Sequence, residues 1–200
     1  MIQDFRNIVL QELTFSKGIN CITGSNGEGK TNLLDAVYYL SMTKSAFNPA
    51  DKFLYRHGAK SFALSGSYSL DSLKTKICIK ADSSAEKRVL RDDRQYQRLA
   101  DHIGLIPVVM VSPGDSALVT DSADERRRFV NAVLSQMDAE YLSTIQRHNR
   151  LLAQRNALLK SGTPQNDLLD AIDAQMEPLA QAIYCSRAEF TAKLEPKVAE

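Results

Sequence analysis

The chain has few of the residues that usually mark a disulfide scaffold or a metal centre. Its 200 residues include three cysteines and three histidines, and tryptophan is absent. The cysteines are scattered without metal-ligand spacing, and their odd number leaves no complete disulfide framework: they are Cys21, Cys78 and Cys185. The histidines are isolated in the sequence, at His57, His102 and His148. The composition therefore gives little support to a metal site or a nucleophilic triad.

Long apolar runs and an excess of one charge are also missing. The longest apolar run, Ile106 to Val111, is far shorter than the roughly 20 residues that span a bilayer. The N-terminus has no basic segment followed by an apolar one. We therefore expect a cytoplasmic protein without a membrane partner. The formal net charge is +1, from 25 basic and 24 acidic residues, and lacks the basic bias of a strong nucleic-acid binder.

Basic residues do gather locally in two places. One cluster lies within residues 87–98, and the other is Arg126-Arg127-Arg128. On charge alone, both clusters are interpreted as solvated faces with local ion pairs.

One segment constrains function more than any other. Residues 24–31 match G-x-x-x-x-G-K-[ST], the loop that wraps the phosphates of a nucleoside triphosphate. Glycines let successive backbone N–H groups point at phosphate oxygens. We expect Lys30 to reach the β- and γ-phosphates and the Thr31 hydroxyl to ligate Mg²⁺. The predicted binding set, here called the phosphate loop, is Gly24, Ser25, Asn26, Gly27, Glu28, Gly29, Lys30 and Thr31.

The flanks of this loop have the context that the motif requires, a strand before it and a helix after it. Residues 19–23 form a short β-prone run after Lys17-Gly18. Downstream, apolar residues recur at steps of three and four between Leu33 and Met42 without proline or glycine, which predicts an amphipathic helix. The helix N-terminus would add to the attraction for anions.

The rest of residues 1–111 is strand-rich. Strand character is present around Ile8 to Phe15, and alternation over 62–70 and 73–79 predicts an antiparallel hairpin that turns near Asp71-Ser72. A further strand pair is expected across Val89-Leu90 and Tyr96, turning at Asp92-Asp93. Residues 106–111 are continuously apolar, which predicts a buried strand.

From Ser112 onward the pattern is helical. Ser122 and Glu125 have capping-box spacing before an apolar stripe, which predicts a helix start. A second helix is expected from about Asp138 to Lys160 and stopped by Gly162, and a third begins after Pro164. A short loop joins the second and third helices, so we expect an antiparallel pair.

Two parts of a hydrolytic site are missing from the sequence. Turnover of a triphosphate needs an acidic residue at the end of an apolar strand to hold Mg²⁺, but the strand predicted at 106–111 ends in Ser112. A Ser-Gly-Gly-Gln-like signature is also missing, because the nearest string, 161–165, lies in the interhelical loop. We therefore expect the N-terminal portion of a larger protein whose second catalytic half lies beyond this sequence.

Several strings together resemble the bacterial RecF family, and they occur in order over most of the chain. They are Phe5-Arg6-Asn7, the phosphate loop continuing as Asn32-Leu33-Leu34-Asp35-Ala36-Val37-Tyr38, the segment from Ser112-Pro113-Gly114-Asp115 to Arg126-Arg127-Arg128-Phe129, and Gln154-Arg155-Asn156-Ala157-Leu158-Leu159-Lys160. The resemblance implies an α/β fold: a phosphate-loop ATP-binding-cassette-type half domain with a mixed sheet and an antiparallel β-meander, followed by an α-helical lobe. Residues 1–111 would form the ATP-binding lobe and residues 112–200 the incomplete helical lobe.

The resemblance also implies a function. RecF proteins are SMC-like ATPases of recombinational DNA repair and replication that bind gapped DNA, act with RecO and RecR in RecA loading, and support SOS induction. ATP and Mg²⁺ would drive homodimerisation, and hydrolysis in the full-length dimer would be slow and DNA-stimulated, with this portion alone inactive. Arg6 would approach the nucleotide, and Lys44, Arg126 and Arg127 would touch DNA or organise the lobe interface. Asp115 would lie near the metal or cap a helix.

Some residues depart from the RecF pattern, and other functions stay open. Asp121 stands where glycine is common, and Lys44-Ser45 stands in a segment often spelled Gly-Arg-Ser. The alternatives are another SMC-like head ATPase, a phosphotransferase built on the same loop, and a non-catalytic interaction fragment. The long helical pair does not fit a phosphotransferase, and its arms are too short for a long coiled coil.

Overall fold

The computed structural model describes residues 1–48, 50–70, 73–82, 86–161 and 166–199. They form two compact units, Met1–Met110 and Val111–Glu200, each described by itself below. The boundary expected from the sequence lies one residue further along the chain.

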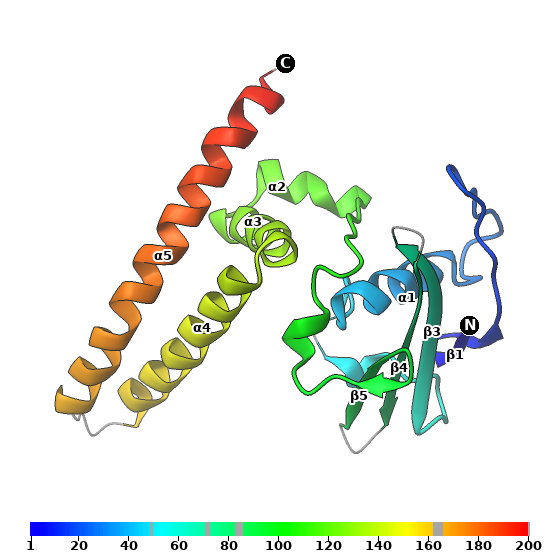
Figure 1. Cartoon of the computed structure of the whole chain (residues 1–200), viewed down its shortest axis with the longest axis horizontal. Helices are drawn as coiled ribbons and strands as arrows, with labels where there is room; N and C mark the ends of the chain where they lie inside the picture. The colour runs from blue at the N-terminus through cyan, green and yellow to red at the C-terminus, as the bar shows by residue number, and fades with distance from the viewer. Residues whose placement is uncertain (49, 71–72, 83–85, 162–165, 200) are drawn as a thin grey trace. The chain divides into compact units, whose positions relative to one another are not determined.

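Six strands of the first unit form one antiparallel sheet in the order β2-β1-β3-β4-β5-β6 (Figure 1). The predicted hairpin and the predicted pair turning at Asp92-Asp93 are confirmed, whereas the turn expected at 71–72 lies outside the described residues. The first strand was not predicted from the sequence. The strands are β1 Ile2–Phe5, β2 Ile8–Gln11, β3 Ser61–Leu70, β4 Leu73–Asp82, β5 Lys87–Arg91 and β6 Arg94–Gln95.

Helix α1, Lys30–Met42, confirms the helix predicted after the phosphate loop and packs against the sheet (Figure 1). Its Tyr39 ring meets the rings of Phe5 and Phe62 edge to face, with centroids 6.1 and 5.5 Å away. These three rings are buried, and burial of each such side chain contributes about 1.5–3 kcal/mol. Leu64, Ile77, Ile79 and Val89 complete this face of the sheet. The core therefore lies between α1 and one face of the sheet.

Two predicted strands are wrong. Residues 19–23 and 106–111 are not strands, and among the described residues neither segment pairs with a strand. Ile19 is 94% exposed, and Val109 and Val111 are 79% and 83% exposed. A β-prone run becomes a strand only when a second strand offers backbone partners. Only Ile22 and Ile106 from these segments pack against the core.

The second unit is helical, as predicted. Helices α4 and α5 lie antiparallel side by side (Figure 1), and Arg155 Nε lies 2.6 Å from Asp173 Oδ1 between them. The stop signals expected at Gly162 and Pro164 lie outside the described residues. The helices of the second unit are α2 Ala117–Thr120, α3 Ala123–Met137, α4 Ala139–Lys160 and α5 Asn166–Val198. Short 3₁₀ turns lie at Asp51–Phe53 and Leu99–His102 in the first unit and at Pro113–Ser116 in the second.

The capping interactions differ from the sequence prediction. Ser122 is the N-cap of α3, but its hydroxyl accepts from the Asp124 N–H at 3.3 Å, so the predicted box with Glu125 is wrong. A reciprocal capping box is present instead at Ser112 and Asp115, where the Ser112 N–H donates to Asp115 Oδ2 at 2.6 Å. The Asp115 carboxylate thus caps a 3₁₀ turn.

The described helices do not include one that is both long and apolar enough to cross a membrane.

Candidate phosphate-binding site

The phosphate loop leads directly into α1, which begins at Lys30. The N-cap residue Gly29 has φ 96° and no side-chain cap, and Gly27 has φ 89°. Residues other than glycine rarely adopt these left-handed values, so the sequence of the loop matches its backbone. The first N–H groups of a helix have no intrahelical acceptor and attract anions. The loop therefore has a donor-rich end where the motif places phosphate.

Lys30 folds back across the loop. Its Nζ donates to the backbone oxygens of Gly24 and Ser25, both at 2.7 Å. Thr31, the predicted magnesium ligand, is the second residue of α1 and is exposed. Among the described residues no group of three or more His, Cys, Asp or Glu side chains forms a metal centre. A cation at this site would thus depend on Thr31, on a bound phosphate and on ligands from elsewhere.

A carboxylate already accepts a hydrogen bond inside the loop. The Ser25 N–H donates to Glu28 Oε2 at 2.8 Å. A Cβ on Gly24 would lie only 2.2 Å from the same oxygen, so a side chain at Gly24 would displace Glu28. The loop therefore presents a backbone donor to an anionic oxygen.

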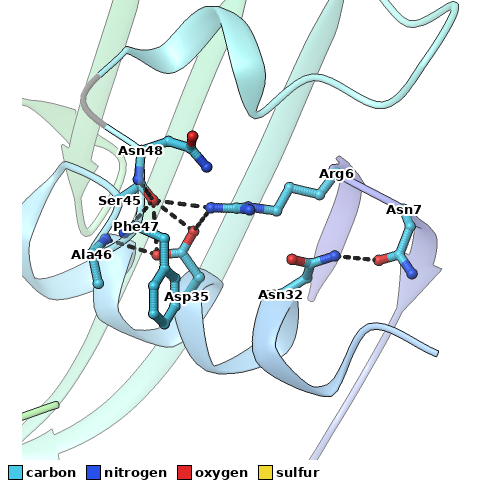
Figure 2. Close-up of polar contacts among 8 residues, drawn as sticks. All are labelled: Arg6, Asn7, Asn32, Asp35, Ser45, Ala46, Phe47 and Asn48. Carbon is cyan, nitrogen blue, oxygen red and sulfur yellow. Dashed lines mark hydrogen bonds and ion pairs between the residues drawn. The ribbon is translucent and has the colours of Figure 1, made fainter. Parts of the chain in front are cut away.

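The turn between β1 and β2 contacts the phosphate loop and the start of α1 through Asn7, whose bond to Asn32 is drawn in Figure 2. The Asn7 amide donates to the Gly27 backbone oxygen at 3.1 Å and accepts from the Asn32 amide at 2.7 Å. A Cβ on Gly29 would lie 2.6 Å from Asn7 Oδ1, so Asn7 packs directly on the N-cap. Asn7 belonged to the family-like string but had no predicted role.

Arg6, the neighbour of Asn7, points to a buried carboxylate (Figure 2). Its Nη2 lies 2.5 Å from Asp35 Oδ2 and donates to Ser45 Oγ at 3.1 Å. Asp35 is fully buried and also accepts from the Ser45 hydroxyl and the Ala46 N–H, both at 2.8 Å. The pKa of the Tyr38 phenol is raised, mainly by burial and secondly by the negative charge of Asp35. The guanidinium predicted to approach the nucleotide therefore pairs with Asp35 in this structure.

The sequence carried a signal for Asp35 that its interpretation missed. Asp35 lies in α1 among the buried residues Leu33, Ala36 and Tyr39. A carboxylate on an apolar helix face needs a partner because an unpaired buried charge is costly. Arg6, 29 residues earlier, is that partner.

The predicted DNA-contact residues have different surroundings. Lys44 is exposed and follows Thr43, the C-cap residue of α1. In the second unit, Arg126 donates to the Leu118 and Asp121 backbone oxygens at 3.0 and 3.3 Å. Arg127 pairs with Asp124. The structure therefore gives Arg126 and Arg127 intramolecular partners and leaves the Lys44 side chain at the surface.

Comparison with known proteins decides the family. The model of the protein family described as "AAA domain" matches residues 1–181, which are most of the chain. The chain belongs to the AAA domain family. Within the AAA domain family, the predicted resemblance to RecF is confirmed: the DNA replication and repair protein RecF of Bacteroides fragilis is 43% identical over 197 residues, which are 98% of this chain and 53% of that protein. The chain spans about half the length of the curated relatives it matches.

Solved structures confirm the predicted fold class of this AAA domain chain. A structure of the recombination mediator protein RecF-ATPrS in the RecFOR pathway superposes with a TM-score of 0.91 at 28% identity, covering 96% of this chain and 53% of that one. An Smc head domain from Pyrococcus furiosus gives a TM-score of 0.52 at 18% identity, over 98% of this chain and 57% of that one. The second likeness concerns the fold alone.

Proposed function

We propose that this AAA domain chain binds ATP with Mg²⁺ at the phosphate loop and is the ATP-binding portion of a RecF-like protein. The observation that carries the proposal is the donor-rich loop, in which the Ser25 N–H donates to the Glu28 carboxylate, an anionic acceptor. A solved relative is named RecF-ATP, which supports ATP as the triphosphate.

The proposed binding residues are those predicted from the sequence. Phosphate oxygens would replace the Glu28 carboxylate at the loop N–H groups. Lys30 would exchange its two carbonyl contacts for the β- and γ-phosphates, and Thr31 would supply a hydroxyl ligand to Mg²⁺. The remaining loop residues contribute backbone donors. Arg6 is a further candidate contact, and to reach a nucleotide it would have to leave Asp35.

On this proposal ATP acts as a switch for DNA binding in repair and replication. The full-length protein would dimerise on DNA with ATP, act with RecO and RecR in RecA loading, and support SOS induction. Each loop would be completed by a signature from the other subunit, and slow hydrolysis would reset the dimer. The signature and the acidic magnesium ligand would come from the part of RecF-like proteins outside this sequence.

A single substitution tests the switch. In the full-length protein, Lys30→Met should abolish ATP-dependent dimerisation on DNA, measured by light scattering with and without ATP. The expected loss follows from removing the cation that faces the β- and γ-phosphates. DNA association that is indifferent both to ATP and to Lys30→Met would overturn the proposal.

Lys44, Arg126 and Arg127 are retained as candidate DNA contacts. Replacing Arg126 and Arg127 with Ala should weaken duplex binding and flatten its salt dependence by about one unit per lost phosphate contact. An unchanged slope would leave both residues with the intramolecular contacts described above.

The alternative is an SMC-like head ATPase with another assembly role. Failure of the full-length protein to bind gapped DNA, with ATP-dependent dimerisation intact, would favour that alternative.

A further inference from the structure

The face of the sheet that α1 does not cover carries a concentrated positive charge. Along β4, Ile77 and Ile79 point into the core, so the alternate positions lie on the opposite face. Those positions include three exposed lysines, Lys74, Lys76 and Lys80. Residues directly opposite one another in antiparallel strands share a face. Register therefore places Ser69 beside Lys74, Ser67 beside Lys76, and Arg88 of β5 beside Lys80.

We call this set, Ser67, Ser69, Lys74, Lys76, Lys80 and Arg88, the basic sheet face. β3, β4 and β5 lie side by side in Figure 1, so the set is continuous across three strands. Antiparallel sheets often leave one face to solvent, and that face usually mixes both signs of charge. Here the described residues of β3 and β4 include one acidic residue, Asp82, at the end of β4. Further acidic residues lie beside the face: Glu86 pairs with Arg88, and Asp92 Oδ1 accepts from the Lys76 backbone N–H at 2.8 Å.

Among the described residues, the lysines of this face have no acidic partner, unlike most members of the other basic clusters. Within the described residues, no ion pair joins Lys74, Lys76 or Lys80 to an acid. By contrast, Arg127 and Arg128 each pair with an acidic residue three positions earlier. Charge that is already paired has less to offer a ligand, because binding must first break the internal contact. Within the part of the chain that the structure describes, the three sheet lysines have no such ion pair to break.

We infer that the basic sheet face binds the phosphodiester backbone of DNA, an inference that rests on the proposed function. Lys74 to Lys80 spans six residues, about 20 Å at roughly 3.3 Å per residue. A DNA strand carries one phosphate per roughly 3.4 Å of helix axis, so the row is long enough to meet several phosphates. Serine hydroxyls beside the lysines add hydrogen-bond donors that commonly contact phosphate. These contacts carry no base-specific information, so the face recognises the backbone and not a sequence.

The test measures the salt dependence of duplex binding by the full-length protein with ATP. The variant is the triple substitution Lys74→Gln, Lys76→Gln and Lys80→Gln. Each lost phosphate contact should reduce the slope of log K against log salt by about 0.9, or about 2.7 for three contacts. The matched control neutralises Lys17, Lys160 and Lys197, which are exposed lysines outside the sheet. The control changes net charge equally and should keep the wild-type slope.

The outcomes separate this inference from the proposed function. A wild-type protein that binds no DNA overturns the proposed function itself. A wild type that binds DNA while the sheet triple keeps its slope overturns the basic sheet face alone, as does an equal loss of slope in the control triple. Thermal melting of all three proteins checks folding, and if the triple is unstable, Lys74→Gln and Lys76→Gln singly should each lower the slope by about 0.9.

Discussion

Two parts of the first unit have similar β-prone sequences but very different structures. In the hairpin of β3 and β4, pairing runs from Ser61 opposite Asp82 to Leu70 opposite Leu73. Residues 19–23 and 106–111 also contain β-prone residues, yet they pair with no strand among the described residues and expose Ile19, Val109 and Val111. We infer that an apolar sequence creates the tendency to form a strand, while the presence of a partner strand decides whether the strand forms.

The position of the partner explains why one region could be predicted and the other could not. The partner of β3 follows almost immediately in the chain, so local alternation carries the information for both strands. A strand in a parallel or mixed sheet needs a partner that is distant in sequence, and a single apolar run does not say whether that partner is present. The phosphate loop lies between the two cases, with an unpaired segment before it and the packed helix α1 after it.

The largest expected effect tests whether the hairpin of β3 and β4 is packed while residues 106–111 are exposed. Phe62→Ala removes a side chain that is 2% exposed and packed against three aromatic rings, so it should lower the free energy of unfolding by about 3–5 kcal/mol. Val109→Ala, at a site 79% exposed, should change it by less than about 0.5 kcal/mol. Urea denaturation of both variants measures the contrast. Comparable losses would mean that residues 106–111 are packed.

The next effect concerns Asp35 in α1, the helix that follows the phosphate loop and packs against the sheet. Asp35→Asn leaves Arg6 facing a neutral amide and removes a charged acceptor from Ser45 and Ala46. Removing one partner of a buried ion pair typically costs 3–5 kcal/mol, and because Arg6 keeps 17% side-chain exposure we expect about 3 kcal/mol. Urea midpoints measure this loss. Arg155→Gln, in a solvent-accessible pair of the second unit, is the control and should lower the urea midpoint much less.

A smaller effect tests whether Asn7, in the turn between β1 and β2, stabilises the phosphate loop. If the proposed ATP site is correct, Asn7→Ala removes both amide contacts to the loop region and should weaken ATP binding about tenfold, or about 1.4 kcal/mol. Isothermal titration measures the affinity, with Asn156→Ala, an exposed helical asparagine, as the control. Asn32→Ala added to Asn7→Ala should have little further effect, because Asn32 reaches Asn7 directly. Additive losses would show that the two residues act separately.

The smallest effect is a pH dependence at His102, in the 3₁₀ turn Leu99–His102. Burial, the largest cause, lowers the pKa of His102 below its ordinary value of 6.5, and His102 Nε2 lies 2.7 Å from the Leu40 backbone oxygen. The folded chain therefore binds this proton less readily than the unfolded chain. Stability is present above pH 6.5 and is lost as the pH falls through the lowered value. His102→Gln cannot titrate, so its urea midpoint should fall less than that of the wild type on acidification. Equal falls would assign the pH dependence to other groups.

Much of the fold could be predicted because its information is local. The phosphate loop, α1, the hairpin and the long helices follow from periodicity and glycine placement within short windows. Three features could not be predicted this way. The ion pair of Arg6 and Asp35 joins distant residues, the unpaired segments depend on a partner strand, and the capping box at Ser112 depends on backbone geometry that the similar spacing at Ser122 does not distinguish.

The turn of Arg6 and Asn7 has a mechanical consequence. These adjacent residues have fixed attachments in different places, Asn7 on the phosphate loop and Arg6 on Asp35 and Ser45. Since one peptide unit separates the two anchors, the loop cannot move far as a body without either releasing Asn7 or pulling on the segment that begins at Ser45. Lys44 immediately precedes that segment. Two consecutive residues near the N-terminus thus connect the phosphate loop to the segment that follows Lys44, a surface lysine 14 residues beyond Lys30.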